Sequence, residues 1–234
     1  MPKGLWMKPV ALITGGARGI GRAIAAELAA DHTVVVTYHS TPPDALLRDC
    51  PDVLALPADL SQPDVAKDVV QQVVTRLGRL DVLINNAGDI AMDDDDPMRT
   101  FAVNLTAPMK LLDAALPHLH SGASVINISS VNAELPAMGA VGYSASKAAV
   151  NTWTRGMAKT LGPKGIRVNA IAPGAIERSE APRPPELVKA FVDMTALGRS
   201  GVPQDIANVA RFLASDAAGF ITGEVITVSG GYRL

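Results

Sequence analysis

Tyr143 and Lys147 are four residues apart in the segment Tyr143-Ser144-Ala145-Ser146-Lys147, at the start of a helical pattern. Side chains at positions i and i+4 lie on one face of a helix, so the phenol and the ammonium can point into one site. A free phenol has a pKa of about 10, and a neighbouring positive charge favours its ionised form. We therefore expect Lys147 to lower the pKa of Tyr143, so that the phenol can exchange a proton with a substrate oxygen near neutral pH. The alternative is a surface pair with no chemical role.

Two further polar side chains fall where they can join this pair. Ser130 follows the strand-like run Val125–Ile128, which places its hydroxyl at the carboxyl edge of a sheet. Ser129 would face the opposite way if the strand continues, and the closer position of Ser130 to Tyr143 along the chain favours Ser130. Asn104 lies inside a helical segment, where an isolated amide is mildly unfavourable. Ser130 and Asn104 are therefore candidates for the same site.

A glycine-rich segment, Thr14–Gly21, directly follows the first strand-like run and opens the first helical pattern. A Cβ at this tight turn would hold the backbone away from a phosphate group bound by the free N–H groups of the helix N-terminus. Glycines at positions 15, 19 and 21 give the spacing G-x-x-x-G-x-G, one residue wider at its start than the G-x-G-x-x-G fingerprint. The strand before it and the helix after it favour a dinucleotide site, with an ordinary helix-opening turn as the alternative.

The end of the second strand-like run indicates which dinucleotide is bound. An acidic residue there would accept hydrogen bonds from the ribose 2′-hydroxyl of NAD. The chain has Tyr38, His39 and Ser40 at this point and no carboxylate. A 2′-phosphate would meet no repulsion, and Arg18 could supply charge-assisted hydrogen bonds to it. We expect NADP(H) rather than NAD(H), with a solvated Arg18 as the alternative.

These candidates need a fold that brings strand ends and helix starts together. Strand-like β-branched runs alternate with helical patterns along the chain, and such alternation with short links requires parallel pairing through right-handed crossovers. We expect one α/β domain over residues 1–234, a Rossmann fold with a doubly wound parallel sheet of about seven strands, helices on both faces, and ligands at the strands' carboxyl ends. The expected strands are Val10–Thr14, Thr33–Thr37, Val53–Leu56, Val82–Asn85, Ser124–Ile128, Ile166–Ile171 and Val225–Val228. The expected helices are Ile20–Ala30, Asp64–Leu77, Met98–His118, Tyr143–Leu161 and Pro203–Ala214, and residues 88–97 and 175–185 are expected to be irregular.

Composition and charge argue against several classes of protein. The net charge of −2 at pH 7 does not suit a surface that neutralises nucleic-acid phosphates. The longest apolar runs are too short to cross a bilayer, and residues 1–8 lack the apolar region of a signal peptide. Cys50 is the single cysteine, so no internal disulfide can form and a reducing compartment fits best. We expect a cytoplasmic protein that binds neither nucleic acid nor membrane.

Two clusters of metal-ligating residue types are better explained by structure. Residues 93–96 are four consecutive aspartates before Pro97, and acids in this position stabilise the N-terminus of the following helix. His118 and His120 flank a helix end and have no further ligands nearby in the sequence. We expect no metal site.

Taken together, the ordered motifs resemble those of the short-chain dehydrogenase/reductase family along the whole chain. The resemblance rests on Thr14–Gly21, Asn85-Asn86-Ala87-Gly88, Ser130, the Tyr143-x-x-x-Lys147 pair and Pro173-Gly174. The segment from Ile221-Thr222-Gly223-Glu224 to Ser229-Gly230-Gly231 is similar to the 3-oxoacyl-(acyl-carrier-protein) reductase branch. The resemblance implies reversible, NADP(H)-dependent hydride transfer between a carbonyl compound and a secondary alcohol.

The resemblance also implies a role for each matched residue at the reacting centre. Tyr143 would be the acid and base, and Lys147 would lower its pKa and bind the nicotinamide ribose. Ser130 would hydrogen-bond the substrate oxygen, and Asn104 would hold a water molecule that connects Lys147 to solvent. The family's helices near Met98 and Tyr143 pair across subunits, which implies a homotetramer or homodimer.

A further set of matched positions would bind the cofactor. Asp59 would contact the adenine, Asn86 would lie beside the adenosine, and Pro173, Gly174 and the amide of Ile176 would flank the nicotinamide. The expected cofactor-binding residues are Gly15, Arg18, Gly19, Ile20, Gly21, Tyr38, His39, Ser40, Asp59, Leu60, Asn86, Ala87, Gly88, Tyr143, Lys147, Pro173, Gly174 and Ile176.

The chain departs from the family pattern in three places. Arg178 stands where the family usually has a threonine that touches the carboxamide, and it either reaches the cofactor pyrophosphate or is a surface charge. The link between Gly88 and Asn104 is shorter than usual, and in the link from Tyr38 to Val53 two prolines replace part of a helix. Two other functions stay open: an NAD-preferring alcohol dehydrogenase acting on a polyol, sugar or steroid, and a catalytically silent dinucleotide-binding sensor or scaffold.

Overall fold

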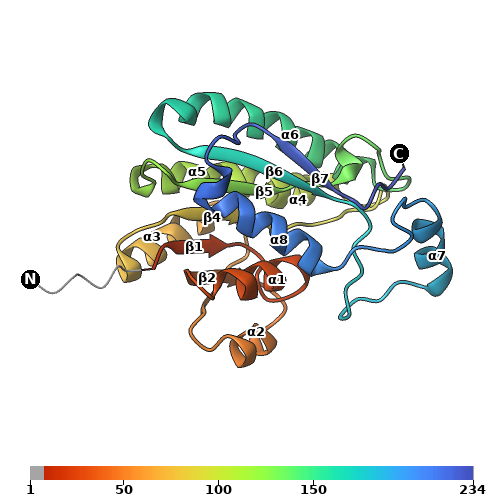
Figure 1. Cartoon of the computed structure of the whole chain (residues 1–234), viewed down its shortest axis with the longest axis horizontal. Coiled ribbons are helices and arrows are strands. Elements are labelled where there is room, and N and C mark those ends of the chain that lie inside the picture. Colours follow the sequence, from red (N-terminus) through yellow and green to blue (C-terminus); the bar gives the residue numbers. More distant parts are fainter. Residues whose placement is uncertain (1–7, 234) are drawn as a thin grey trace, which may run out of the picture.

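The structure, a computed structural model, describes residues 8–233, so the expectation that the N-terminal segment is no signal peptide falls on residues outside the described part. Seven strands form one parallel sheet in the order β3-β2-β1-β4-β5-β6-β7 (Figure 1). This confirms the predicted doubly wound sheet. The strand order reverses between β1 and β4, which is the point where sheets of this kind bind ligands. The strands are β1 (Val10–Ile13), β2 (Thr33–Tyr38), β3 (Leu54–Pro57), β4 (Val82–Asn85), β5 (Ser124–Ile128), β6 (Arg167–Pro173) and β7 (Val225–Val228).

Helices cover both faces of the sheet, as Figure 1 shows. One face carries α3 (Val65–Leu77), α5 (Ala107–Ala115) and α6 (Val141–Leu161), and the other carries α1 (Gly19–Leu28) and α8 (Pro203–Ala214). Successive strand residues serve opposite faces: Leu12 and Leu83 pack under the first helix layer, and Ile13 and Ile84 pack under the second. The central strands are therefore buried on both sides, which explains why they are almost continuously apolar.

The helix expected over Met98–His118 is not continuous. The chain forms α4 (Pro97–Phe101), a π-helical segment (Ala102–Thr106), α5, and a 3₁₀ turn (Leu116–His118). Pro108 has no N–H to donate to the carbonyl of Asn104, and in a regular α-helix its ring would clash with that carbonyl. The wider π turn relieves this clash, so the prediction of an unbroken helix is wrong at Asn104.

Two short helices were not expected. They are α2 (Asp44–Asp49), in the link after β2, and α7 (Pro185–Asp193), which follows the irregular stretch after β6. Pro185 occupies the first turn of α7 and Glu186 is an acid in that turn. Both are ordinary helix-start signals. The prolines just before them in the sequence favoured the prediction of an irregular segment instead.

Two of the four aspartates of residues 93–96 cap helices: Asp96 caps the helix that follows, as predicted, and Asp93 caps a different one. Asp96 Oδ1 accepts a hydrogen bond of 2.9 Å from the N–H of Met98 in α4, and Asp93 Oδ1 accepts one of 2.7 Å from the N–H of Val141, the first residue of α6. Within residues 8–233, no helix has the length and apolar character needed to span a membrane. The same range holds no group of three or more His, Cys, Asp or Glu side chains arranged to bind a metal ion.

Candidate active site

A cleft of about 420 Å³ follows the carboxyl edge of the sheet. Its walls come from the loops after six strands, β1 to β6, so it spans the point where the strand order reverses. Every residue expected to bind the cofactor lines this cleft, as do Ser130, Tyr143 and Lys147. Asn104 is 2% exposed and lies behind the cleft wall.

The reacting centre forms at the first turns of α6. Lys147 Nζ lies 5.8 Å from the centroid of the Tyr143 ring and donates a hydrogen bond of 2.8 Å to the carbonyl of Ile128, at the end of β5. The Ser130 side chain lies near enough to the Tyr143 hydroxyl to favour ionisation of the phenol, and both side chains line the cleft. Ser129 points elsewhere, because its hydroxyl donates to Asn151 Oδ1 at 2.6 Å. The phenol, the ammonium and one of the two serine hydroxyls thus share the same space.

Burial dominates the titration of this pair. Lys147 is 4% exposed, and burial lowers the pKa of its ammonium to about 8. Burial also raises the pKa of the Tyr143 phenol, an effect opposed by the Ser130 side chain and by the positive charge of Arg178. Desolvation outweighs both, so in the protein without a cofactor the pKa of Tyr143 lies above its usual value. The expected lowering by Lys147 and a bound nicotinamide stays a prediction.

Asn104 is held rigidly behind the reacting centre. Its Oδ1 accepts a hydrogen bond of 2.8 Å from the N–H of Asp89, and its Nδ2 donates to the carbonyl of Asp89 and to Ser146 Oγ, each at 2.9 Å. A Cβ placed on Gly88 would lie 3.6 Å from Asn104 Oδ1 and 3.8 Å from Lys147 Nζ. The amide of Asn104 and the ammonium of Lys147 therefore both lie close to Gly88.

The glycine-rich turn has the shape of a phosphate cradle. Gly15 and Gly19 adopt positive φ angles of 65° and 54°, and a Cβ on Gly21 would collide with the carbonyl oxygen of Gly15 and the side chain of Asn86. Asn86 itself donates to the carbonyls of Thr14 (2.8 Å) and Gly15 (3.0 Å), which fixes the turn. The residues present fit a dinucleotide pyrophosphate, because backbone N–H groups can approach the phosphates without side chains in the way.

Two threonines that the sequence did not single out support this turn. Thr37 Oγ1 accepts a hydrogen bond of 3.1 Å from the N–H of Gly15, and Thr14 Oγ1 accepts from the N–H groups of Asn86 (3.0 Å) and Ala87 (2.9 Å). The available signal was a hydroxyl residue at the end of an otherwise aliphatic strand, where a buried polar group must find a partner.

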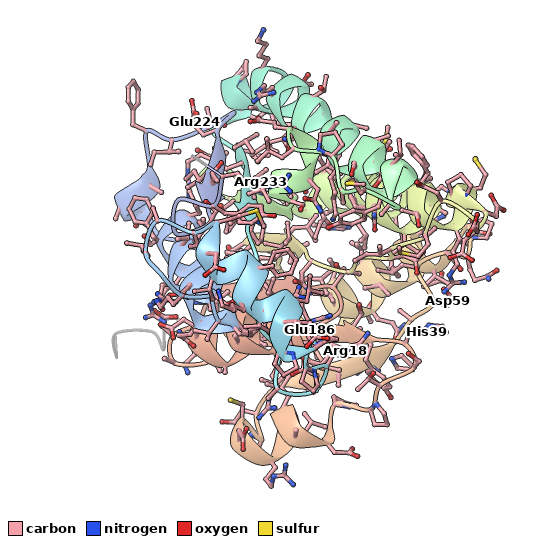
Figure 2. All side chains as sticks on the ribbon, turned by 90° about the vertical axis from the view of Figure 1, so that its right-hand side faces the viewer. Arg18, His39, Asp59, Glu186, Glu224 and Arg233 are labelled. Atoms are coloured by element: carbon pink, nitrogen blue, oxygen red, sulfur yellow. The ribbon has the colours of Figure 1, made fainter. Side chains whose placement is uncertain are left out.

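The other end of the cleft carries His39, Asp59 and Arg18. In Figure 2, His39 and Asp59 lie next to each other at the right, and Arg18 lies nearer the centre of the view. His39 Nε2 lies 3.8 Å from Asp59 Oδ2. The Ser61 hydroxyl donates to Asp59 Oδ1 at 2.7 Å, and this hydrogen bond holds the pKa of Asp59 below its usual value. Arg18 is exposed and forms no ion pair within residues 8–233.

Three arginines also line the cleft at its reacting end: Arg178 and Arg183, from the segment before α7, and Arg99, from α4. The sequence pointed to Arg178 as a departure from the family pattern but did not single out the other two. Arginines on loops and short helices carry no periodic signal, so only the fold could bring them together.

Comparison with known proteins agrees with this geometry. A family model described as enoyl-(acyl carrier protein) reductase matches residues 15–233. The chain is 39% identical to an uncharacterised oxidoreductase of Methylorubrum extorquens, over 96% of this chain and 97% of that protein. It is 37% identical to the 3-oxoacyl-(acyl-carrier-protein) reductase of Staphylococcus aureus, over 96% of this chain and 98% of that one.

A solved structure shares the fold closely. A short-chain dehydrogenase from Burkholderia cenocepacia, crystallised in complex with NADP, superposes with a TM-score of 0.92 at 33% identity, covering 99% of this chain and 100% of that one. The chain belongs to the short-chain dehydrogenase/reductase family of NAD(P)-dependent oxidoreductases.

Proposed function

We propose that the protein reduces a ketone to a secondary alcohol with NADPH, and catalyses the reverse reaction with NADP. The observation that carries this proposal is the convergence of Tyr143, Ser130 and Lys147 in the cleft that also contains the glycine-rich turn. When bound, the cofactor supplies or accepts the hydride. The chain's own residues then have to position the carbonyl group and manage one proton.

The proton is assigned to Tyr143. Ser130 and Tyr143 line the same cleft, with the serine near the phenol, so a carbonyl oxygen placed between the two hydroxyls would accept hydrogen bonds from both. Proton transfer from Tyr143 to that oxygen leaves a phenolate, which the Lys147 ammonium stabilises. Asn104 lies close to Gly88, as Lys147 does, and its fixed amide keeps this part of the wall in place for the relay of a proton through water.

NADP(H) is the preferred cofactor in this proposal. No carboxylate follows β2 to accept the 2′-hydroxyl of NAD, and Tyr38, His39 and Ser40 line the cleft there. Arg18 lines the same cleft and forms no ion pair among the described residues. The NADP complex of the Burkholderia cenocepacia relative supports the same choice.

A 3-oxoacyl thioester or a similar ketone is the proposed class of substrate. The C-terminal motif and the similarity to the Staphylococcus aureus reductase support it. We assign substrate selection to the loop after β5 and the segment before α7, because Ser130 at the start of the loop and Arg178 and Arg183 of the segment line the cleft.

Replacement of Tyr143 by Phe tests the acid–base role. The variant keeps the ring but loses the proton, so kcat should fall by at least about a hundredfold, the usual contribution of a general acid. NADPH binding, followed by its fluorescence, should stay within about twofold of wild type because the cofactor keeps its other contacts. Retention of most of the activity in Tyr143→Phe would refute the assignment.

Two further properties are proposed with the function. Exposed apolar side chains on α4, α5 and α6, namely Met98, Met109 and Val141, support a homodimer or homotetramer that pairs these helices, and light scattering would give its mass.

The lone cysteine, Cys50, supports a location in the reducing cytoplasm.

A further inference from the structure

Two charged side chains of opposite sign lie against the first residue of α1. They are Arg178 and Glu180, in the segment between β6 and α7 that runs beside α1 in Figure 1. A Cβ placed on Gly19 would lie 3.2 Å from Arg178 Cδ and 3.2 Å from Glu180 Oε1. Gly19 is the first residue of the helix whose N–H groups form the phosphate cradle.

Arg178 differs from the other arginine of this segment. Arg183 is fully engaged: it pairs with Glu177 Oε1 at 2.6 Å, donates to the carbonyl of Ile176 at 2.8 Å and stacks on the ring of Phe191. Arg178 is half-buried in the cleft wall and has no acidic partner within 4.0 Å in the part of the chain that the structure describes. A partly desolvated guanidinium without a counter-ion favours binding of an anion.

Two contacts of Arg178 indicate where the bound anion lies. Its aliphatic stem lies against Gly19, and its positive charge acts on the Tyr143 phenol. A dinucleotide bound with its phosphates at Gly19 and its nicotinamide beside Tyr143 carries its pyrophosphate along this line. A substrate carboxylate would instead lie beyond Tyr143, away from Gly19.

We propose that Arg178 binds the cofactor pyrophosphate. We propose also that Glu180, which lies at the N-terminus of α1 in the free protein, competes with the pyrophosphate for this position. This inference rests on the proposed function, since it requires a bound dinucleotide. The carboxylate of Glu180 is favoured at the positive end of the helix, but a pyrophosphate in the cradle repels it. Binding of the cofactor therefore repels Glu180 from the N-terminus of α1 and attracts Arg178 to the phosphates.

Arg178→Ala tests the first half of the proposal through binding rather than activity. Affinity would be measured by titration for three probes: NADPH, 2′-phospho-ADP-ribose, which has a pyrophosphate but no nicotinamide, and adenosine 2′-monophosphate, which has neither. Loss of charge-assisted bonds to the pyrophosphate should weaken the first two by about tenfold or more. Adenosine 2′-monophosphate should bind within about twofold of wild type, and Arg178→Lys should recover part of the loss.

Glu180→Gln tests the second half. Removal of the competing charge while the side chain keeps its size should tighten NADPH and 2′-phospho-ADP-ribose by a few fold, with no change for adenosine 2′-monophosphate. Lys189→Ala is the matched control, because Lys189 is an exposed cation on α7 with its ammonium on Asp193, and its loss should change none of the three affinities.

Each possible failure has a distinct meaning. Unchanged affinities in Arg178→Ala with a raised KM for the carbonyl substrate would assign Arg178 to a substrate anion and overturn the proposal. Unchanged affinities together with an unchanged KM would show that Arg178 is a solvated charge, and would also overturn the proposal. A wild-type protein that binds neither NADPH nor NADH would instead overturn the proposed function itself.

Discussion

At the scale of single residues, Lys147 is the group whose chemistry depends most on its surroundings. It is buried, and within residues 8–233 its ammonium has one hydrogen-bond acceptor, the carbonyl of Ile128. Burial disfavours the charged form and lowers its pKa to about 8, whereas the proposed reaction needs the charge to stabilise a phenolate at Tyr143. The site therefore operates close to the pH at which its cation is lost.

This balance predicts the pH dependence of reduction. Lys147 is charged below its pKa of about 8 and neutral above it, so kcat/KM for the ketone should be level at lower pH and fall as the pH rises through that region. In Lys147→Arg the guanidinium keeps its charge across the range, so the residual activity should lose this fall. Rates at saturating NADPH across a pH series would show both profiles; an identical fall in the two proteins would assign the titration to another group.

At the level of helices and strands, regular sequence patterns predicted the fold, whereas irregular segments gave no signal for part of the site. The inner strands were recognisable because burial on both faces makes them short runs rich in aliphatic residues, whereas the edge strands β3 and β7 are partly exposed. The motifs at strand ends then placed Tyr143, Ser130 and the glycine-rich turn at one edge. The direction of the pKa shift of Tyr143 could not be predicted, because desolvation depends on every group packed around the ring.

The π-helical segment was likewise not predictable from the sequence pattern. The apolar periodicity of residues 98–118 continues through it, so the pattern alone predicted a regular helix. The local cause is a single missing N–H at Pro108, two residues after the π-helical segment ends. Its consequence is the position of Asn104, whose amide is fixed to Asp89 and Ser146. Such π segments often occur at functional sites.

Pro108→Ala should restore a regular helix and thereby misplace Asn104. We expect kcat to fall by about tenfold, since displacement of a supporting group by about 1 Å has effects of this order or larger. The melting temperature should stay the same or rise, because the substitution removes a residue that opposes helix formation. Pro117→Ala, in the 3₁₀ turn that ends the same segment, is the matched control and should leave kcat unchanged. A wild-type kcat in Pro108→Ala would show that the π turn does not position the reacting centre.

At the scale of the whole molecule, the cleft joins parts of the chain that are far apart in sequence. The glycine-rich turn after β1, the polar residues after β2 and β3, and the reacting centre on α6 all contribute to it. A dinucleotide along this edge would hold six strand ends together. Its binding should therefore stabilise the entire fold and not a single loop.

Thermal unfolding turns this into a test of cofactor preference. A ligand present at about a hundred times its Kd adds about 2.7 kcal/mol to stability, and in a chain of this size 1 kcal/mol raises the melting temperature by about 2–4 °C. NADPH at that excess should therefore raise it by about 5–10 °C, and NADH at the same concentration by less, because it makes no bonds through a 2′-phosphate to Arg18, His39 or Ser40. Tyr143→Phe should keep the NADPH shift, whereas Arg18→Ala should reduce it toward the NADH value. A shift with NADH equal to or larger than that with NADPH would contradict the preference for NADP(H) and would favour an NAD-linked alcohol dehydrogenase.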